Sequence, residues 1–391
     1  MITVFWISLF IAFYTFVGYG FLLYFIIKIK RAFKGKPVLP VVTGDELPSC
    51  TLVVAAYNEE HFIEQKIANS LQLNYPQGKL KFVFVTDGSS DRTPEIIGQH
   101  PLIQLLHRPE RAGKIAAVHR AMEYVDTEVV VFTDANTFLN AEAITRICRH
   151  YSDKTVGAVA GEKRVQIDAS ADASAAGEGF YWKYESALKK WDSELYSVVG
   201  AAGELFSVRR NLYQDVPADT VLDDFMISML IAAKGYRIIY EPEAYALETA
   251  SENVSEELKR KIRIAAGGIQ SILRLQGLLL PFKFPVLSFQ YISHRVLRWT
   301  VTPFFLILAF ITNFAVAFAG KGIIYELLFA GQVLFYCLAI FGYIMEERHI
   351  RIKILFIPYY FCVMNYAVMA GIIRYFTTKQ SAVWEKAQRK K

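Results

Sequence analysis

The first 27 residues contain no Asp, Glu, Lys or Arg and are rich in Phe, Ile, Leu and Tyr. A helix of that length, at about 1.5 Å per residue, crosses a hydrocarbon core of roughly 30 Å. Residues 1–27 are therefore predicted to form a transmembrane anchor. A cleaved signal peptide is the alternative, but the apolar run is too long and no charged segment precedes it.

Basic residues follow the anchor directly, namely Lys28, Lys30, Arg31, Lys34 and Lys36. Because cytosolic flanks of membrane spans carry an excess of Lys and Arg, we expect the amino terminus outside and the chain from Lys28 onward in the cytosol. Residues 28–48 are interpreted as a basic linker.

Further spans are predicted near the carboxyl end, because 53% of all residues are hydrophobic and the mean hydropathy is +0.26. Within residues 300–376, the segments Thr300–Ala319, Ile323–Met345 and Ile354–Ile373 are long enough to cross. Three crossings after a cytosolic domain would leave the basic tail, residues 377–391, outside, against its charge. Either the last segment is re-entrant or the preceding segment dips into the membrane, and the sequence does not choose between them.

The four cysteines lie far apart in the sequence, and neither a Cys-x-x-Cys pair nor a nearby His cluster accompanies them. This spacing argues against a disulfide framework or a structural zinc site. It fits a reducing compartment.

Between the ends, residues 49–250 alternate short apolar runs with amphipathic stretches, which predicts a cytosolic α/β domain. The predicted strands are Thr51–Ala56, Phe82–Thr86, Val129–Thr133, Val156–Gly161, Gly203–Val208 and Tyr236–Tyr240, the first three of them parallel. Residues 251–299 follow as amphipathic, interfacial helices suited to contact with membrane lipid. A plain surface helix is the alternative there.

Polar side chains follow several of these strands at the points where they end. Asp134 and Asn136 close the run Val129–Thr133, where two oxygen ligands can hold a hard cation against a diphosphate. The alternative is an Asx turn that caps the next helix. The first strand runs into Tyr57 and Glu59, and the second into Asp87, whose following Gly permits close approach of a ligand.

Two more groups have the chemistry of an anion site and a base. Lys114 follows Gly113 at the start of a predicted helix, where backbone amides and an ammonium favour an anion. Asp223 and Asp224 are adjacent at another helix start, so we expect at most one of them to point into a cleft.

Taken in order, these motifs resemble the family 2 glycosyltransferases, and most closely the membrane polysaccharide synthases that make cellulose, hyaluronan and poly-N-acetylglucosamine. The segments that carry the resemblance are Ala56-Tyr57-Asn58-Glu59, Asp87-Gly88-Ser89-Ser90-Asp91, Asp134-Ala135-Asn136 and Asp223-Asp224. The resemblance implies a GT-A-type, Rossmann-like cytosolic domain in an integral protein of the plasma or inner membrane.

The resemblance also implies roles for individual residues. Asp87 would contact the nucleotide base, and Asp224 would be the catalytic base. Asp134 and Asn136 would hold Mg²⁺ or Mn²⁺ on the diphosphate. The segment 200–210, with Gly203, Arg209 and Arg210, is similar to the one that lines the acceptor site.

Two departures from the family pattern matter. Asn136 stands where a second metal-binding Asp is expected. The Gln-x-x-Arg-Trp motif of processive polymerases is missing, and its best positional match is Arg260-Lys261-Ile262-Arg263-Ile264. Arg260 and Arg263 are still expected to face the diphosphate, but the Trp that would stack on the acceptor is absent.

The predicted function is inverting transfer of a sugar from a nucleotide-diphosphate sugar, expected to be UDP-linked, to a growing polysaccharide. A single addition to a lipid-linked acceptor is the first alternative, and an inactive nucleotide-binding scaffold of an export channel is the second. The predicted spans are few for a tunnel that carries a polymer. This favours an accessory membrane subunit or a homo-oligomer. No nucleic-acid partner is expected.

Overall fold

The protein is described here by a computed structural model that covers residues 1–37, 42, 44–166, 173–249, 254–348, 350 and 352–378. The predicted linker 28–48 is thus described in part, and the predicted tail lies outside the described residues beyond Thr378. The core is an eight-stranded sheet in the order β3-β2-β1-β4-β7-β6-β8-β5. The strands are β1 (Cys50–Ala56), β2 (Leu80–Asp87), β3 (Ile103–Arg108), β4 (Val129–Asp134), β5 (Phe138–Leu139), β6 (Val156–Gln166), β7 (Leu205–Arg209) and β8 (Arg237–Thr249).

Strand direction changes within this sheet. β1 pairs in parallel with β2 and β4, and β2 pairs in parallel with β3, so the three strands predicted to be parallel are confirmed. β7 is antiparallel to both of its neighbours, β4 and β6. β8 is parallel to β6 and antiparallel to β5. The predicted α/β class is confirmed as a mixed sheet, whereas β3 and β5 were not predicted.

Helices cover both faces of the sheet because its central strands are apolar on both sides. In β1, Val53 packs into one core, and Leu52 and Val54 pack into the other. One face is covered by α5 and α8, and the other by α3, α4 and α6. These helices are α3 (Ile63–Leu71), α4 (Thr93–Gly98), α5 (Lys114–Glu123), α6 (Ala143–Cys148) and α8 (Asp223–Ala233).

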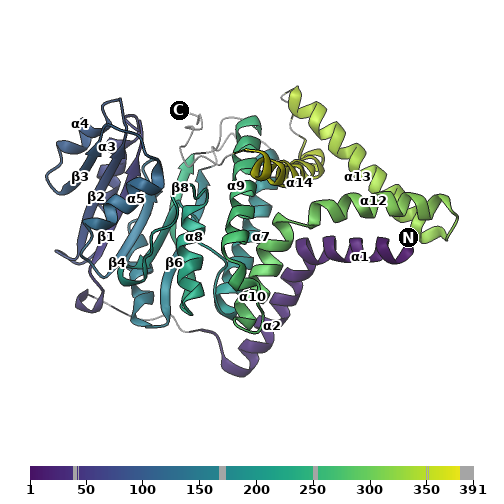
Figure 1. The fold of residues 1–391 in the computed structure, drawn as a ribbon, viewed down its shortest axis with the longest axis horizontal. Helices are drawn as coiled ribbons and strands as arrows, with labels where there is room; N and C mark the ends of the chain where they lie inside the picture. The colour runs from purple at the N-terminus through teal and green to yellow at the C-terminus, as the bar shows by residue number, and fades with distance from the viewer. Residues whose placement is uncertain are drawn as a thin grey trace.

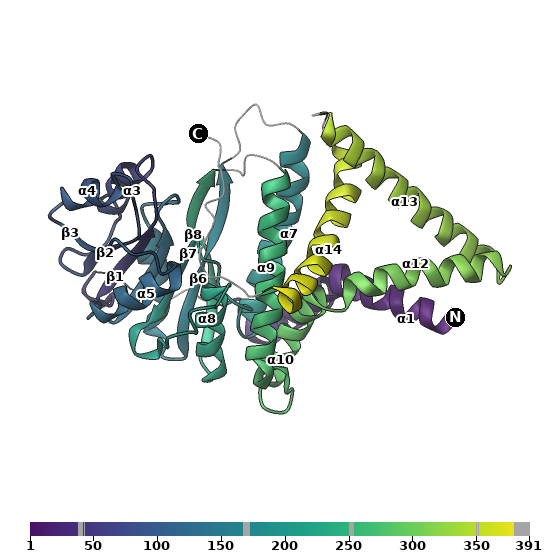
Figure 2. The ribbon, with the colours of Figure 1, turned by 45° about the horizontal axis from the view of Figure 1, so that its top comes forward.

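Two long helices, α7 and α9, stand between the sheet and the apolar terminal helices (Figures 1 and 2). Three helical stretches, Ile2–Lys34, Ile323–Glu347 and Ile354–Thr377, are long and apolar enough to cross a membrane, and a pair bent by 62° could supply a fourth span. The helices of this half are α1 (Ile2–Phe13), α2 (Tyr19–Lys34), α7 (Ala173–Leu195), α9 (Val254–Arg274), α10 (Pro285–Tyr291), α11 (Leu297–Trp299), α12 (Thr302–Phe318), α13 (Ile323–Glu347) and α14 (Lys353–Thr377).

A buried polar cluster, which we call the anchor joint, ties α7 to the amino-terminal helix and to the segment around α10. It consists of Glu185, Asp192, His294, Arg295 and Arg298, with Tyr19 and Gln290 as hydrogen-bond partners. His294 lies between the two carboxylates, with Nδ1 2.6 Å from Asp192 and Nε2 3.2 Å from Glu185. The cluster therefore connects three segments that are far apart in the sequence.

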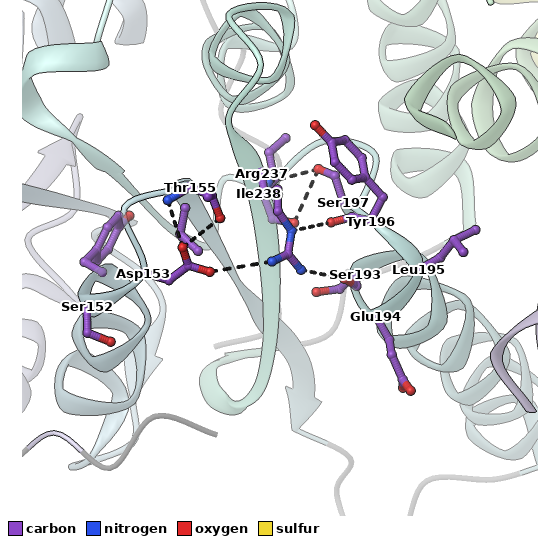
Figure 3. Close-up of polar contacts among 12 residues, drawn as sticks. Ser152, Asp153, Thr155, Ser193, Glu194, Leu195, Tyr196, Ser197, Arg237 and Ile238 are labelled. Atoms are coloured by element: carbon purple, nitrogen blue, oxygen red, sulfur yellow. Dashed lines mark hydrogen bonds and ion pairs between the residues drawn. The ribbon is translucent and has the colours of Figure 1, made fainter. Parts of the chain in front are cut away.

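The carboxyl end of α7 is held from two sides. Arg237 of β8 donates to the Tyr196 carbonyl oxygen at 2.8 Å and lies 3.6 Å from Asp153 (Figure 3). From the other side, Arg31 of α2 donates to both carboxylate oxygens of Glu194, at 2.7 and 2.6 Å. Cations at the carboxyl end of a helix complement its unpaired carbonyl groups. Helix α7 thus links the sheet to the amino-terminal helix.

Candidate active site

The site lies at the carboxyl edge of the parallel strands. The register pairs Ala56 of β1 with Thr86 of β2 and Ala55 with Asp134 of β4, so the residues that follow these strands meet at one edge. An open cavity lies there. Its lining contains the predicted residues Tyr57, Glu59, Asp87, Lys114, Asp134 and Asn136 together with Arg111.

Asp87 organises the loop that precedes α5. Its carboxylate accepts hydrogen bonds from the backbone N–H groups of Ala112, at 3.1 Å, and Gly113, at 2.6 Å. The same loop places the guanidinium of Arg111 over the Tyr57 ring, 3.8 Å from its centre. Gly88 has φ +69, and a Cβ there would lie 2.6 Å from the Arg111 Cβ. Glycine is therefore required for this close approach.

Lys114 joins side chains from three segments. Its Nζ lies 2.6 Å from Asp134 Oδ1, and both side chains are less than a fifth exposed. A Cβ on Gly203 would lie 3.4 Å from Lys114 Nζ and 3.3 Å from Asp224 Oδ2, so Gly203 leaves room where the two groups approach. We call Lys114, Asp134, Asp223 and Asp224 the site cluster.

Electrostatics within the site cluster favour a protonatable Asp224 and a charged Lys114. Burial raises the pKa of Asp224 to about 7, and the neighbouring Asp223 adds to this effect. Burial alone would lower the pKa of Lys114, but Asp134, Asp223 and Asp224 together raise it above its ordinary value. Both Asp223 and Asp224 thus act on one ammonium, and the expectation that at most one of them points into the cleft stays a prediction.

Asp134 and Asn136 fit a metal site. The backbone carbonyl of Asp134, and not its carboxylate, accepts from the Thr137 hydroxyl at 3.0 Å, which argues against the Asx-turn alternative. The Oδ1 atom of Asn136 is buried and has no hydrogen-bond partner among the described residues. A buried acceptor of this kind is available to ligate a cation. In the described part of the chain no three His, Cys, Asp or Glu side chains form a metal-binding group, so a cation here would need further ligands from substrate or water.

Arg260 and Arg263 of α9 have different neighbours. Arg260 donates to both carboxylate oxygens of Glu257, each at 3.1 Å. Arg263 lies close enough to Asp223 and Asp224 for their charges to oppose the lowering of its pKa by burial. Of the two arginines expected to face the diphosphate, Arg263 therefore lies nearer to the site cluster.

Arg209 and Arg210 do not lie at the site, contrary to their place in the acceptor-like segment. Because β7 runs antiparallel to β4, Arg209 pairs with Val129 at the start of β4, whereas Leu205 pairs with Thr133 near Asp134. Arg209 donates to the carbonyl oxygens of Val156 and Tyr151, each at 2.7 Å. Its role in these contacts is structural.

Sequence reasoning missed two lysines next to the site. Lys66 is fully buried under the end of β4, where its Nζ donates to Thr133 Oγ1 at 3.1 Å and to the Thr137 carbonyl at 2.6 Å. Lys163 bonds Glu204 Oε1 at 2.6 Å and also contacts Glu248. A signal existed for Lys66, because its spacing from Ile63 places it on the buried face of α3.

Comparisons with known proteins agree with this arrangement. Residues 51–216 match the model of glycosyl transferase family 2. A poly-β-1,6-N-acetyl-D-glucosamine synthase of Staphylococcus aureus (strain COL) is 28% identical over 275 residues, which cover 68% of this chain and 64% of the relative. The corresponding synthase of Staphylococcus epidermidis is 24% identical over 265 residues, covering 65% and 62%. The match thus spans just under two thirds of these relatives.

A solved structure matches almost the whole chain. It is a mannosyltransferase from Pyrobaculum calidifontis in complex with GDP-Man and Mn²⁺, with a TM-score of 0.70 and 26% identity over 96% of this chain and 99% of the other. The likeness therefore includes the apolar terminal helices as well as the sheet. Residues 51–216 of this chain thus match the glycosyl transferase family 2 model, within a GT-A-type fold that carries candidate membrane helices at both ends.

Proposed function

We propose that the protein is an inverting glycosyltransferase that moves a sugar from a nucleotide-diphosphate sugar, preferably UDP-linked, to a growing polysaccharide at the cytosolic membrane face. The observation that carries this proposal is that Lys114 and Asp134 line one cavity and that Asp224 lies beside Lys114 near Gly203. The similarity to poly-β-1,6-N-acetyl-D-glucosamine synthases supports the polysaccharide acceptor.

In the proposed reaction, an acceptor hydroxyl attacks the anomeric carbon of the donor while the bond from that carbon to the diphosphate oxygen breaks. Asp224 takes the hydroxyl proton, and the diphosphate leaves with the bonding electrons. The pKa of Asp224, raised to about 7 by burial, suits a general base near neutral pH. Lys114, which three carboxylates keep charged despite its burial, stabilises negative charge on the leaving group.

Asp134 and Asn136 are the residues that would hold Mg²⁺ or Mn²⁺. When bound, the cation supplies positive charge that neutralises the diphosphate. The P. calidifontis mannosyltransferase was solved with Mn²⁺, which supports a divalent cation here. Tyr57, Glu59, Asp87 and Arg111 are proposed to bind the nucleoside part, since they line the remainder of the cavity.

A second candidate is the addition of one sugar to a lipid-linked acceptor. It is favoured by Ile264, which stands where processive members of the group have a tryptophan. In this case the apolar helices would hold the lipid and no polymer channel would be required.

The test is a product analysis on detergent-solubilised full-length protein. The protein is incubated with a panel of UDP and GDP sugars and with Mg²⁺ or Mn²⁺, and the released nucleoside diphosphate is measured. A ladder of long chains supports the polysaccharide synthase, and a single lipid-soluble product supports the second candidate. Failure to release nucleoside diphosphate from every donor, with membrane acceptors present, would contradict both.

A further inference from the structure

Helix α14 is apolar and long enough to cross a membrane, yet it packs along α9. A Cβ on Gly371 would come within 2.5 Å of the Ala265 Cβ and 2.9 Å of the Ile262 carbonyl oxygen, so the two backbones approach closely. Arg374, in the last turn of α14, lies close enough to Arg263 for the two cations to repel each other. The carboxyl end of α14 therefore lies near the site cluster.

The direction of α14 differs from that of the helices beside it. α1 and α12 run away from the sheet in both views, whereas α14 stays alongside α9 and crosses their direction (Figures 1 and 2). The other end of α14 meets α13 near its carboxyl end, where a Cβ on Gly342 would lie 2.4 Å from the Leu355 carbonyl oxygen. If α1 and α12 follow the membrane normal, α14 lies in the membrane plane.

The side chains of α14 separate into two apolar faces. Phe356, Tyr359 and Ala367 are buried against the rest of the protein. The outer face is exposed and consists of Ile354, Ile357, Tyr366, Ile373 and Phe376, which are 52–73% exposed. Helix α13, which packs against α14, also exposes apolar side chains such as Leu334. A water-covered position for so many exposed apolar side chains is unfavourable.

The charges at the two ends of α14 agree with an in-plane position. Lys353 is the first residue of α14 and Arg374 lies in its last turn, and in the sequence Arg351 precedes these residues and Lys379 follows them. A span with cations at both ends would place one group on the external side, against the usual distribution of Lys and Arg. A helix at the cytosolic interface keeps both groups on the favoured side and near anionic lipid.

We propose that α14 is an interfacial helix whose outer apolar face binds the lipid of the cytosolic leaflet, and that it does not cross the bilayer. The crossings are then the amino-terminal anchor, α12 and α13. Three crossings place Thr378 on the same side as the catalytic domain. This assignment removes the conflict between the basic tail and a fourth crossing.

The sidedness of Thr378 tests this proposal. In full-length protein with Cys337 and Cys362 replaced by serine, the single substitutions T378C, K321C and E95C are labelled with a membrane-impermeant maleimide in intact cells and in sealed inverted vesicles. Glu95 reports the catalytic domain, and Lys321 reports the loop between α12 and α13. We expect T378C to label with E95C and opposite to K321C. Labelling of T378C together with K321C would overturn the proposal.

The depth of the helix gives a second, independent measurement. Spin labels at Ile354, Tyr366 and Ile373 in lipid vesicles are compared for accessibility to oxygen and to a water-soluble nickel complex. An interfacial helix gives equal, shallow depths at all three positions, whereas a span places Tyr366 deepest. Ile323, Leu334 and Ile344 of α13 are the matched control and should show the gradient of a span. Neither measurement needs catalytic activity, so its outcome is separate from that of the proposed function.

Discussion

The site cluster and the anchor joint are both groups of buried charges, but their atoms are paired differently. In the anchor joint, Asp192 accepts from Tyr19, Gln290 and His294, and Glu185 contacts His294 and two arginines. In the site cluster, Asp134 has the Lys114 ammonium, while the adjacent Asn136 Oδ1 is buried with no hydrogen-bond partner in the described part of the chain.

The titration behaviour follows the same division. The arginines and His294 hold the pKa of Glu185 well below its ordinary value despite its burial. The pKa of Asp224 is instead raised to about 7, because burial and Asp223 outweigh the Lys114 charge. Gln290 Oε1 and Arg295 Nε of the anchor joint are also buried with no hydrogen-bond partner in the described part of the chain, so the two groups differ in their carboxylates. Those of the anchor joint are held by several partners and serve the fold, whereas a raised carboxylate pKa such as that of Asp224 is typical of functional sites. The comparison predicts that mutations in the site cluster mainly lower activity, whereas mutations in the anchor joint mainly lower stability.

The largest expected effect is on catalysis. Asp224→Asn removes the proposed base and should lower the rate of transfer by about 10²–10⁴-fold, with nucleotide binding retained. The measurement is nucleoside diphosphate release together with donor binding by calorimetry. Asp215→Asn is the matched control, because Asp215 is exposed and lies outside the site cluster. Wild-type turnover of the Asp224 variant would remove this residue from the mechanism.

Mutations in the anchor joint are expected to lower the stability of the protein. Asp192→Ala leaves His294 and Gln290 buried without their shared carboxylate, and the loss of one partner of a buried ion pair costs about 3–5 kcal/mol. We expect a clearly lower thermal unfolding temperature in detergent. Asp126→Ala, which breaks an exposed pair with Lys81, is the control and should leave the unfolding temperature unchanged. Equal unfolding temperatures for the two variants would contradict the assignment of the joint.

Much of the site could be predicted because its residues follow recognisable strands. The runs that end before Tyr57, Asp87 and Asp134 form neighbouring parallel strands, and their carboxyl ends meet at one edge. Periodicity does not report strand direction, however. The reversal of β7 carries Arg209 to the opposite edge, and it could not be predicted from the sequence pattern.

Contacts between segments that are far apart in the sequence could not be predicted either. Asp192 and His294 are 102 positions apart, and nothing in either local sequence indicates their contact. Cys50 and Cys148 lie far apart in the sequence but are buried neighbours in the structure, and their mutual contact contributes to the raised pKa of Cys50. Such contacts depend on how helices pack across the sheet, which a local pattern does not specify.

The pH dependence of activity can sharpen the comparison. A base is active when ionised, so activity should fall as the pH decreases through about 7, the pKa of Asp224. Asp223→Asn removes a negative neighbour and should lower that pKa, which moves the acidic limb of the pH profile to lower pH. The ratio of activity at pH 6 to activity at pH 8 should therefore increase. An unchanged profile would show that another group controls the limb.

The smallest expected effect concerns the unpaired atom of Asn136. Asn136→Asp adds a second carboxylate beside Asp134, and added ligand charge strengthens the binding of a hard cation. We expect the Mn²⁺ concentration for half-maximal donor binding to fall by about tenfold, equivalent to about 1.4 kcal/mol. Asn140→Asp is the control, because the Asn140 side chain bonds backbone atoms of Glu243 and Tyr245 instead. If both variants bind Mn²⁺ like the wild type, Asn136 is not a ligand, and its buried oxygen must be satisfied by the nucleotide sugar or by water.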